Sequence, residues 1–452
     1  MNEITKASPR FSYPFSSLQT IAQDVLNQAR KGGATACETD ISDGFGQNVT
    51  VRKGTVETIE YNRDKGLAVT VYVGQKRGQA STSDFSPTAI RDTVAAALSI
   101  AGHTAADECA GLAEADLLAR EFPDLDLYFP WDLPVEHAIE LAKTCEAAAF
   151  EADMRITNSE GANVSLNESQ FVYANSFGFM GGYPASRHSI SCAVIASHDE
   201  SMQRDYWYSV ARDAADLEQA ESIGKKAGSR TAARLGARKV ATCEIPVLFE
   251  APIASGLMGH FVSAVSGGSL YRKSSFLLDS IGRQIFPPHI QIRELPHLKK
   301  GLASGAFDNE GVATRERKVV ENGVVQGYFL SIYSARKLGL RTTANAGGNH
   351  NLILDNDDGM EFSALLKKMG RGVLVTELLG QGVNPVTGDY SRGAAGFWIE
   401  GGEIRHAVEE ITIAGNLKDM LLGISAVGND GVARGSKKCG SLLIDRMVVA
   451  GG

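Results

Sequence analysis

Apolar residues recur at helical spacing in two segments near the start of the chain. Residues 18–29 place apolar side chains at i, i+3, i+4, i+7 and i+8, which predicts an amphipathic helix that ends at Gly32-Gly33. In the second segment, Ser86-Pro87 supply a capping residue and a proline at the first helical position, and apolar residues continue to Ala101. Two helices are therefore expected within the first 105 or so residues.

Between these helices the pattern changes to the alternation of β-strands. Residues 48–52, 56–62 and 67–73 alternate apolar with polar side chains. Lys53-Gly54 and residues 64–66 (Asp-Lys-Gly) separate them and are typical of turns. The pattern predicts a β-meander, so this part of the chain should form a helix–sheet–helix unit.

The middle of the chain predicts a second mixed unit. An acidic stretch with two prolines, residues 121–131, is rich in aromatic side chains and indicates an ordered linker. The periodicity beyond it predicts helices at 135–152 and 220–235, and strands at 168–175 and 188–196.

Glycine is frequent in the second half of the chain, where many of the 48 glycines occur as close pairs. Short strand-like segments between glycine-rich turns predict a β-rich region. Residues 236–239 precede the apolar segment 245–249 and mark the best domain boundary. The expected fold class is therefore α+β with several domains, since 452 residues exceed one usual core. The expected domains are 1–115, 116–238 and 239–452.

Composition narrows the functional classes. The net charge of −8 and the pI of about 5.7 argue against direct binding of nucleic acid. No apolar run is long enough for a membrane span, and residues 1–17 show no secretory signal. The six cysteines lie apart from one another, as in a reduced protein. We therefore expect a cytoplasmic location.

A search for catalytic motifs finds none that is complete. The nine histidines include no pair at i, i+4 or i, i+5, the spacing that places two imidazoles on one face of a helix. No nucleophile elbow or phosphate-binding loop occurs. Cys439-Gly440-Ser441 invites comparison with a nucleophile, but a buried thiol at a strand end is the better interpretation. No catalytic residue is assigned.

Several motifs occur together in the chain. They are residues 255–276 (SGLMGHFVSAVSGGSLYRKSSF), 334–339 (SARKLG), 376–382 (TELLGQG), 388–398 (GDYSRGAAGFW) and 410–420 (EITIAGNLKDM), with residues 67–72 and 83–87 near the start. Together these segments resemble the TldD/PmbA family of metallopeptidases, and in particular its PmbA (TldE) branch, over nearly the whole chain.

The resemblance implies a metal site that this chain has lost. In the TldD branch a helical His-Glu-x-x-x-His motif and a later cysteine bind zinc, and the glutamate is the general base. The first histidine falls on Ser255, the glutamate on Gly256 and the cysteine on Val427, whereas the second histidine is kept as His260. One imidazole cannot replace three ligands and a base. We expect no metal in this chain, and zinc in a TldD-type partner.

The resemblance also implies partners. A heterodimer with a TldD-type subunit would enclose the zinc site in a cleft that admits unfolded or extended peptides, and the chain could form a homodimer when alone. Candidate cleft or partner residues are Tyr271, Arg272, Tyr390 and Trp398, although the aromatic residues equally suit a core. The complex would mature or degrade peptides, including leader removal and degradation of antitoxins.

Two other functions remain open at this stage. The chain could be a stand-alone metallopeptidase that combines His260 with acidic residues from elsewhere. It could also be a non-enzymatic regulator linked to DNA gyrase, a role attached to the family name. Metal content distinguishes the first alternative, and a DNA-binding assay tests the second.

Overall fold

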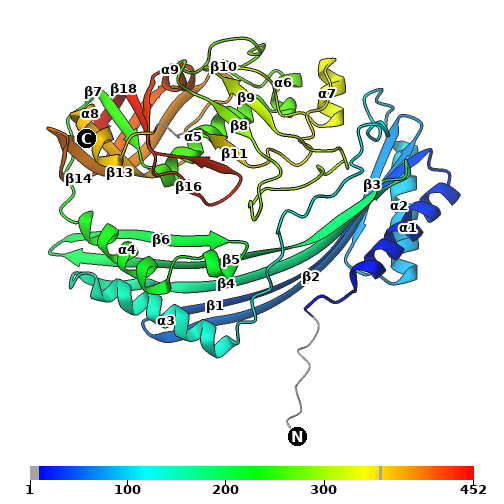
Figure 1. The fold of residues 1–452 in the computed structure, drawn as a ribbon, viewed down its shortest axis with the longest axis horizontal. Coiled ribbons are helices and arrows are strands. Elements are labelled where there is room, and N and C mark those ends of the chain that lie inside the picture. The colour runs from blue at the N-terminus through cyan, green and yellow to red at the C-terminus, as the bar shows by residue number, and fades with distance from the viewer. Residues whose placement is uncertain (1–9, 356–358, 452) are drawn as a thin grey trace, which may run out of the picture.

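The computed structural model describes residues 10–355 and 359–451. Its N-terminal half forms one long antiparallel sheet, and its C-terminal half forms a β-rich unit stacked on the inner face of that sheet (Figure 1). This mixture of helices and sheets, with a β-rich C-terminal region, confirms the predicted α+β class. The division at residues 115 and 238 stays a prediction.

The long sheet takes strands from both sides of residue 115. Its order is β3-β2-β1-β4-β5-β6, and β1 pairs with β4 over nearly its whole length. The strands are β1 (Ala36–Arg52), β2 (Thr55–Val73), β3 (Lys76–Thr82), β4 (Ile156–Asn175), β5 (Met180–His198) and β6 (Ser201–Ala211).

One turn predicted from the sequence is wrong. Lys53 and Gly54 do turn the chain, and both have positive φ. Residues 64–66, however, continue β2 as extended backbone paired with Ser42–Gly44 of β1. Neighbouring strand hydrogen bonds outweigh the turn preference of Asp-Lys-Gly there, because the pairing partner runs past it without interruption. The two expected strands at 56–62 and 67–73 are therefore one.

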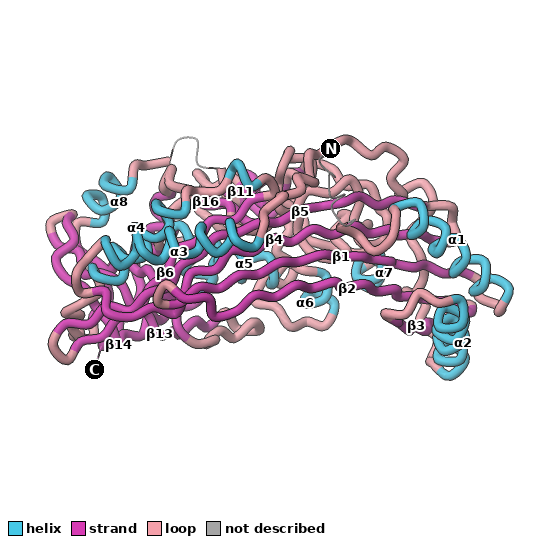
Figure 2. Tube along the Cα trace, turned by 90° about the horizontal axis from the view of Figure 1, so that it is seen from below, coloured by secondary structure: helices cyan, strands magenta, loops and turns pink. Residues whose placement is uncertain are grey.

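Helices cover the two ends of the outer face of this sheet (Figure 2). One pair packs at each end around its own apolar cluster, and the predicted helices are all present. The first pair is α1 (Phe15–Lys31) and α2 (Pro87–His103), and the second is α3 (Val135–Glu151) and α4 (Ala220–Ala233).

The C-terminal unit contains two sheets. One has the order β10-β9-β8-β11-β17-β16; the other has the order β14-β13-β12-β7-β18-β15 and closes through a further pairing of β14 with β18. The strands are β7 (Cys243–Phe249), β8 (Ile292–Glu294), β9 (Arg317–Glu321), β10 (Val324–Val325), β11 (Leu352–Leu354), β12 (Arg371–Leu379), β13 (Asp389–Glu400), β14 (Glu403–Asn416), β15 (Ile424–Val427), β16 (Val432–Ala433), β17 (Lys437–Cys439) and β18 (Leu442–Gly451).

Helices fill the space between and around these two sheets, and a large apolar core that includes Phe249, Phe261 and Phe286 joins them. The helices are α5 (Ala251–Ala264), α6 (Gly267–Tyr271), α7 (Ile332–Leu338), α8 (Phe362–Met369) and α9 (Leu417–Leu422).

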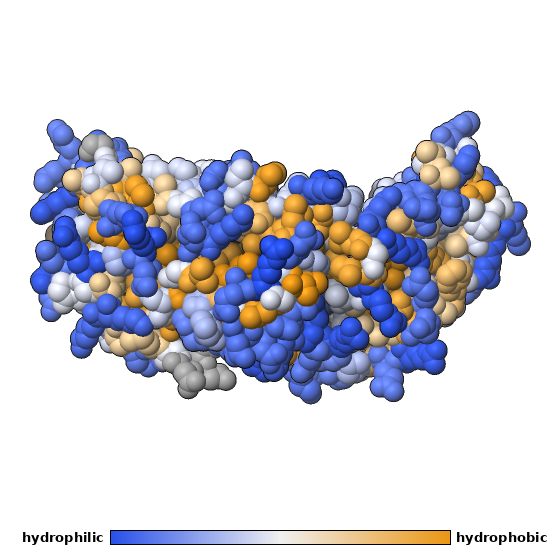
Figure 3. Space-filling model, turned by 90° about the horizontal axis from the view of Figure 1, so that it is seen from above, coloured by the Kyte–Doolittle hydropathy of each residue, from blue (hydrophilic) through white to orange (hydrophobic). Residues whose placement is uncertain are grey.

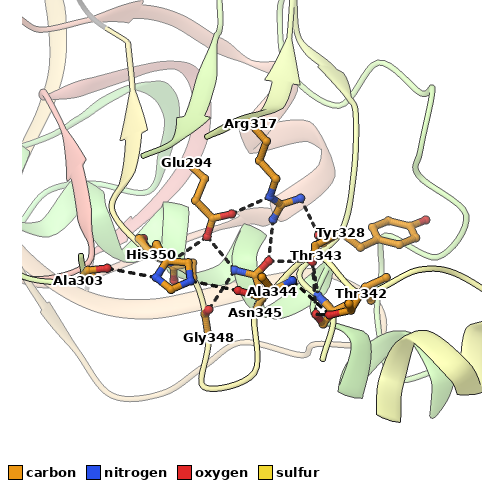
Figure 4. A network of polar contacts seen from close by, with 12 residues as sticks. Glu294, Ala303, Arg317, Tyr328, Thr342, Thr343, Ala344, Asn345, Gly348 and His350 are labelled. Carbon is orange, nitrogen blue, oxygen red and sulfur yellow. Dashed lines mark hydrogen bonds and ion pairs between the residues drawn. The ribbon is translucent and has the colours of Figure 1, made fainter. Parts of the chain in front are cut away.

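A buried carboxylate anchors the loops beside β8. Glu294 is 1% exposed and accepts hydrogen bonds from Arg317 Nε at 2.6 Å, Asn345 Nδ2 at 2.8 Å and the backbone N–H of His350 at 2.7 Å. Arg317 also donates to Tyr328 O at 2.8 Å (Figure 4). Each buried charge therefore has several partners, as buried ions require.

The two halves of the molecule meet through aromatic and charged side chains. In the linker, Phe122 packs edge-on against Phe307, and Tyr128 donates to Glu168 at 2.8 Å, which confirms that this segment is ordered. On the face turned away from the long sheet, apolar residues form a band across the middle (Figure 3). No helix in the described ranges is long and apolar enough to cross a membrane.

Candidate functional site

Helix α5 carries three of the four positions that the sequence singled out. Its buried stripe includes Leu257, Met258 and Phe261 and packs into the C-terminal core. Ser255 and Gly256 instead line a cavity. His260 lies on the same helix, as the resemblance to the helical motif of the TldD branch implies.

His260 has an aromatic neighbour. Its ring lies 6.0 Å from the ring of Tyr390 in an edge-on arrangement. Burial lowers the pKa of His260, and the nearby charge of Arg392 lowers it further, so the imidazole is neutral at pH 7. The residue is therefore packed against the β13 strand rather than held by an acidic partner.

The other three positions offer little to a metal ion. The Ser255 hydroxyl donates to Pro252 O of its own helix at 3.2 Å. A Cβ on Gly256 would meet no atom within 4 Å, so this position opens onto free space. Val427 ends β15 and is 8% exposed within the apolar core. Within residues 10–355 and 359–451, no three His, Cys, Asp or Glu side chains gather as a metal site.

Ser441 connects the segment after Val427 to the start of α5. This residue is fully buried. Its hydroxyl accepts a hydrogen bond from the backbone N–H of Ala251 at 3.0 Å and donates one to Asp430 Oδ2 at 2.6 Å. The fold thus brings the 427–430 loop to the N-terminal end of α5. Cys439 lies at the end of β17, and burial raises the pKa of its thiol to about 12, so it is an inert core residue.

The cavity beside Ser255 and Gly256 has a volume of about 450 Å³ and lies between the two halves of the molecule. Helix α5, strands β12 and β13 and the β16–β17 loop form one side, whereas β6 and α4 form the other. Its lining residues are Arg204, Asp205, Tyr206, Trp207, Arg230, Pro252, Ile253, Ser255, Gly256, Thr376, Glu377, Leu378, Arg392 and Arg434.

Ion pairs occupy one wall of this cavity. Arg230 donates to both carboxylate oxygens of Glu250, at 2.6 and 3.0 Å, and its Nε lies 3.3 Å from Asp205. Arg234 pairs with Glu377 at 2.5 Å. These contacts tie α4 to the C-terminal unit and fix the distance between the two walls.

The four candidate cleft residues separate into two pairs. Tyr390 and Trp398 are 2% and 9% exposed and belong to the C-terminal core, so little of their surface is available to a peptide. Tyr271 and Arg272 lie at the end of α6, where Tyr271 packs edge-on against Tyr333 and accepts a hydrogen bond from Arg272 at 3.0 Å. The first pair lies on β13, whereas the second lies at the end of α6.

Sequence reasoning missed the arginines of the cavity. Arg392 lies within the motif 388–398, but its charge drew no attention there, and Arg434 lies in a glycine-rich turn. They come together only because β13 and the β16–β17 loop face β6 across the space between the halves. No local spacing in the sequence signals this.

A larger cavity of about 940 Å³ lies elsewhere, between the long sheet and α7, and contains two buried carboxylates. Glu38 accepts hydrogen bonds from Tyr72 at 3.2 Å and Tyr173 at 2.7 Å. Burial raises the pKa of Glu310 to about 8, although the backbone N–H of Ile332 donates to it at 2.7 Å. Glu310 is therefore largely protonated at neutral pH.

Comparisons with known proteins place this architecture among peptidases. Models of the PmbA/TldA metallopeptidase match at residues 37–101 (domain 1), 128–235 (central domain) and 242–451 (C-terminal domain). The chain is 49% identical to Metalloprotease PmbA of Escherichia coli O157:H7 over 93% of each chain.

Two solved structures are similar over nearly their whole length. A Bacteroides thetaiotaomicron protein, named as a proposed modulator of DNA gyrase, has a TM-score of 0.90 at 27% identity, over 96% of this chain and 99% of that one. TldE from Thermococcus kodakarensis has a TM-score of 0.84 over 95% and 100% of the two chains. At 19% identity, this second similarity concerns the fold.

Proposed function

Because the chain belongs to the PmbA/TldD family of metallopeptidases, we propose that it is the subunit of a peptidase complex that does not bind the metal. A TldD-type subunit would hold the zinc ion and carry out hydrolysis. This chain would close the cleft over an unfolded or extended peptide and position it.

The observation that carries the proposal is the side-chain content of α5. A catalytic zinc ion usually takes three protein ligands and leaves one position for water. At the family's ligand positions this chain has the hydroxyl of Ser255, which is bonded to its own helix, and the hydrocarbon side chain of Val427. Only His260 has a donor that zinc prefers, so these residues do not fit a zinc ion.

General-base chemistry is missing at the same place. The family's glutamate falls on Gly256, which has no side chain to take a proton from water. A positioned base typically contributes ~10²–10⁴ in rate, so its loss alone would leave little hydrolysis. The chain therefore contributes structure and binding surface to the reaction, while its partner contributes the chemistry.

The location of the cavity supports a role in holding peptide. It borders Ser255 and Gly256, the two positions where the partner type would present zinc-binding chemistry, and it lies between the two halves of the chain. The substrates we propose are cytoplasmic peptides that lack stable structure, including leader peptides of modified precursors and labile antitoxins.

A reconstitution experiment tests this function. The isolated chain should not cleave an unstructured reporter peptide, whereas a mixture with a TldD-type subunit that retains the His-Glu-x-x-x-His motif should cleave it and lose activity with a chelator. The partner alone and the partner with heat-denatured chain are the controls. Equal activity of the partner with and without this chain would contradict the proposal.

The same preparation distinguishes the rival functions. Metal-dependent cleavage by the isolated chain would favour a stand-alone peptidase. Salt-sensitive binding to duplex DNA would favour a regulator that contacts DNA directly, which the charge of −8 disfavours.

A further inference from the structure

The cavity beside α5 holds more positive charge than its acidic residues balance. Four arginines line it, together with the carboxylates of Asp205 and Glu377. Those carboxylates are already engaged by Arg230 and Arg234 of α4. Arg204, whose side chain is 44% exposed, pairs with Glu160 at 2.9 Å.

Arg392 and Arg434 have no such partner. Among the residues that the structure describes, neither forms an ion pair with a carboxylate within 4.0 Å, although both residues line the cavity. Arg434 is held in place by stacking 4.0 Å from the ring centres of Trp207 and Tyr208. Its guanidinium is therefore fixed in position before any ligand arrives.

Four buried polar atoms of the same lining make no hydrogen bond, and one of them, Arg230 Nε, lies 3.3 Å from Asp205 in an ion pair. The other three are Arg392 Nε, Arg434 Nη2 and the hydroxyl oxygen of Thr376, a residue that is only 9% exposed. Buried donors in folded proteins nearly always have a partner, so a group of unpaired donors around one cavity indicates a missing acceptor. The two arginine atoms can only donate, which restricts the ligand to one that accepts hydrogen bonds.

We propose that this cavity binds a carboxylate of the peptide substrate between Arg392 and Arg434, with Thr376 as a further donor. The inference rests on the proposed function, because it assumes that the ligand is a peptide. The carboxylate could be the peptide's C-terminus or an acidic side chain. Planar guanidinium groups match both oxygens of such a group.

Two features of the surroundings favour this ligand. Burial lowers the pKa of Arg434, so a bound anion would offset the cost of its buried charge. Gly256 leaves the neighbouring wall open, since no atom lies within 4 Å of where its Cβ would stand. A peptide main chain can approach α5 there without a steric clash.

Calorimetric titration of the isolated full-length chain tests the proposal with three hexapeptides of otherwise identical sequence. The first has a free C-terminal carboxylate and no acidic residue, the second is amidated with one internal glutamate, and the third is amidated with glutamine at that position. We expect binding of the first, the second or both, and at least tenfold weaker binding of the third, since charged hydrogen bonds are lost.

Substitutions locate the site. Arg392→Gln and Arg434→Gln should each weaken binding of the preferred peptide about tenfold or more. Arg405→Gln is the matched control, because Arg405 lies on β14 in an exposed pair with Glu403, and it should change affinity less than twofold. Thr376→Val, a nearly isosteric change, provides a second test if an arginine variant does not fold.

Several results would overturn the inference. These are equal affinity for all three peptides, binding of none, or unchanged affinity in folded arginine variants. Arginine-dependent binding of inorganic phosphate without binding of any peptide would also contradict it, in favour of a phosphate site. Because the reconstituted cleavage assay is separate, active mixtures without carboxylate preference would refute this inference and leave the proposed function intact.

Discussion

Buried carboxylates show most clearly how single residues constrain this fold. Glu294 pairs with Arg317 and accepts hydrogen bonds from three donors within 2.8 Å, whereas burial raises the pKa of Glu310, which has one backbone donor and the carboxylates of Asp308 and Glu38 nearby. A buried carboxyl group therefore forms an ion pair at Glu294, whereas at Glu310 it is held protonated. Two predictions follow from this difference.

Glu294→Gln should lower the free energy of unfolding by about 3–5 kcal/mol, because it removes the charge that compensates the buried Arg317. An amide would also direct N–H groups at existing donors. Glu403→Gln, which removes one member of an exposed pair with Arg405, should change stability by less than ~1 kcal/mol. Chemical denaturation of both variants measures the difference, and equal effects would refute the role given to Glu294.

Glu310 should make stability depend on pH. Its pKa in the folded chain is about 8, above the ordinary value of 4.5, so between these values the folded state keeps a proton that the unfolded chain has released. Raising the pH from 5 to 8 therefore lowers the free energy of unfolding, by up to a few kcal/mol.

Glu310→Gln should remove this contribution, since a glutamine oxygen can still accept the backbone N–H of Ile332. Denaturation of the variant and the parent at pH 5, 6, 7 and 8 should show a stability difference that grows in favour of the variant. A difference that is constant over this range would contradict the raised pKa.

At the scale of elements, glycines in helices have opposite roles in α4 and α5. A Cβ on Gly224 would stand 1.9 Å from the carbonyl oxygen of Cys145, so α3 and α4 touch through backbone there. Gly256 of α5 meets nothing within 4 Å. Helix propensity alone would treat these two positions alike.

Gly224→Ala should therefore destabilise the chain by roughly 1–3 kcal/mol, because α3 and α4 must separate. Gly256→Ala should be neutral or stabilising by up to ~1 kcal/mol, since it improves a helix interior without a clash. Thermal unfolding of the two variants provides the measurement. A stabilised Gly224→Ala variant would refute the close helix contact.

Elements with a clear local signal could be predicted from the sequence, and α1 and α2 are examples, because an apolar stripe or a Ser-Pro cap is a property of neighbouring residues. The local pattern divides the long strand β2 in two, because it does not contain the pairing of residues 64–66 with Ser42–Gly44 of β1. The cavity was missed for the same reason. Arg392 and Arg434 are brought together by the stacking of two sheets, which no spacing along the chain encodes.

At the scale of the whole molecule, residues of both halves line the cavity beside α5. The ion pair of Arg230 with Glu250 joins α4 to the residue before α5, and so connects one cavity wall to the helix that carries Ser255, Gly256 and His260. The family resemblance identifies the positions that would bind the metal or act as the base, namely Ser255, Gly256, His260 and Val427. Their side chains distinguish a catalytic subunit from one that only positions the peptide. Those side chains favour the proposed supporting role.

Zinc analysis of the purified, dialysed chain tests that assignment most directly. One imidazole cannot retain the ion against water, so we predict well below about 0.1 zinc per chain, and no change in zinc content or stability in His260→Ala beyond a packing effect. A zinc content near one per chain, lost in His260→Ala together with peptidase activity of the isolated chain, would contradict the account.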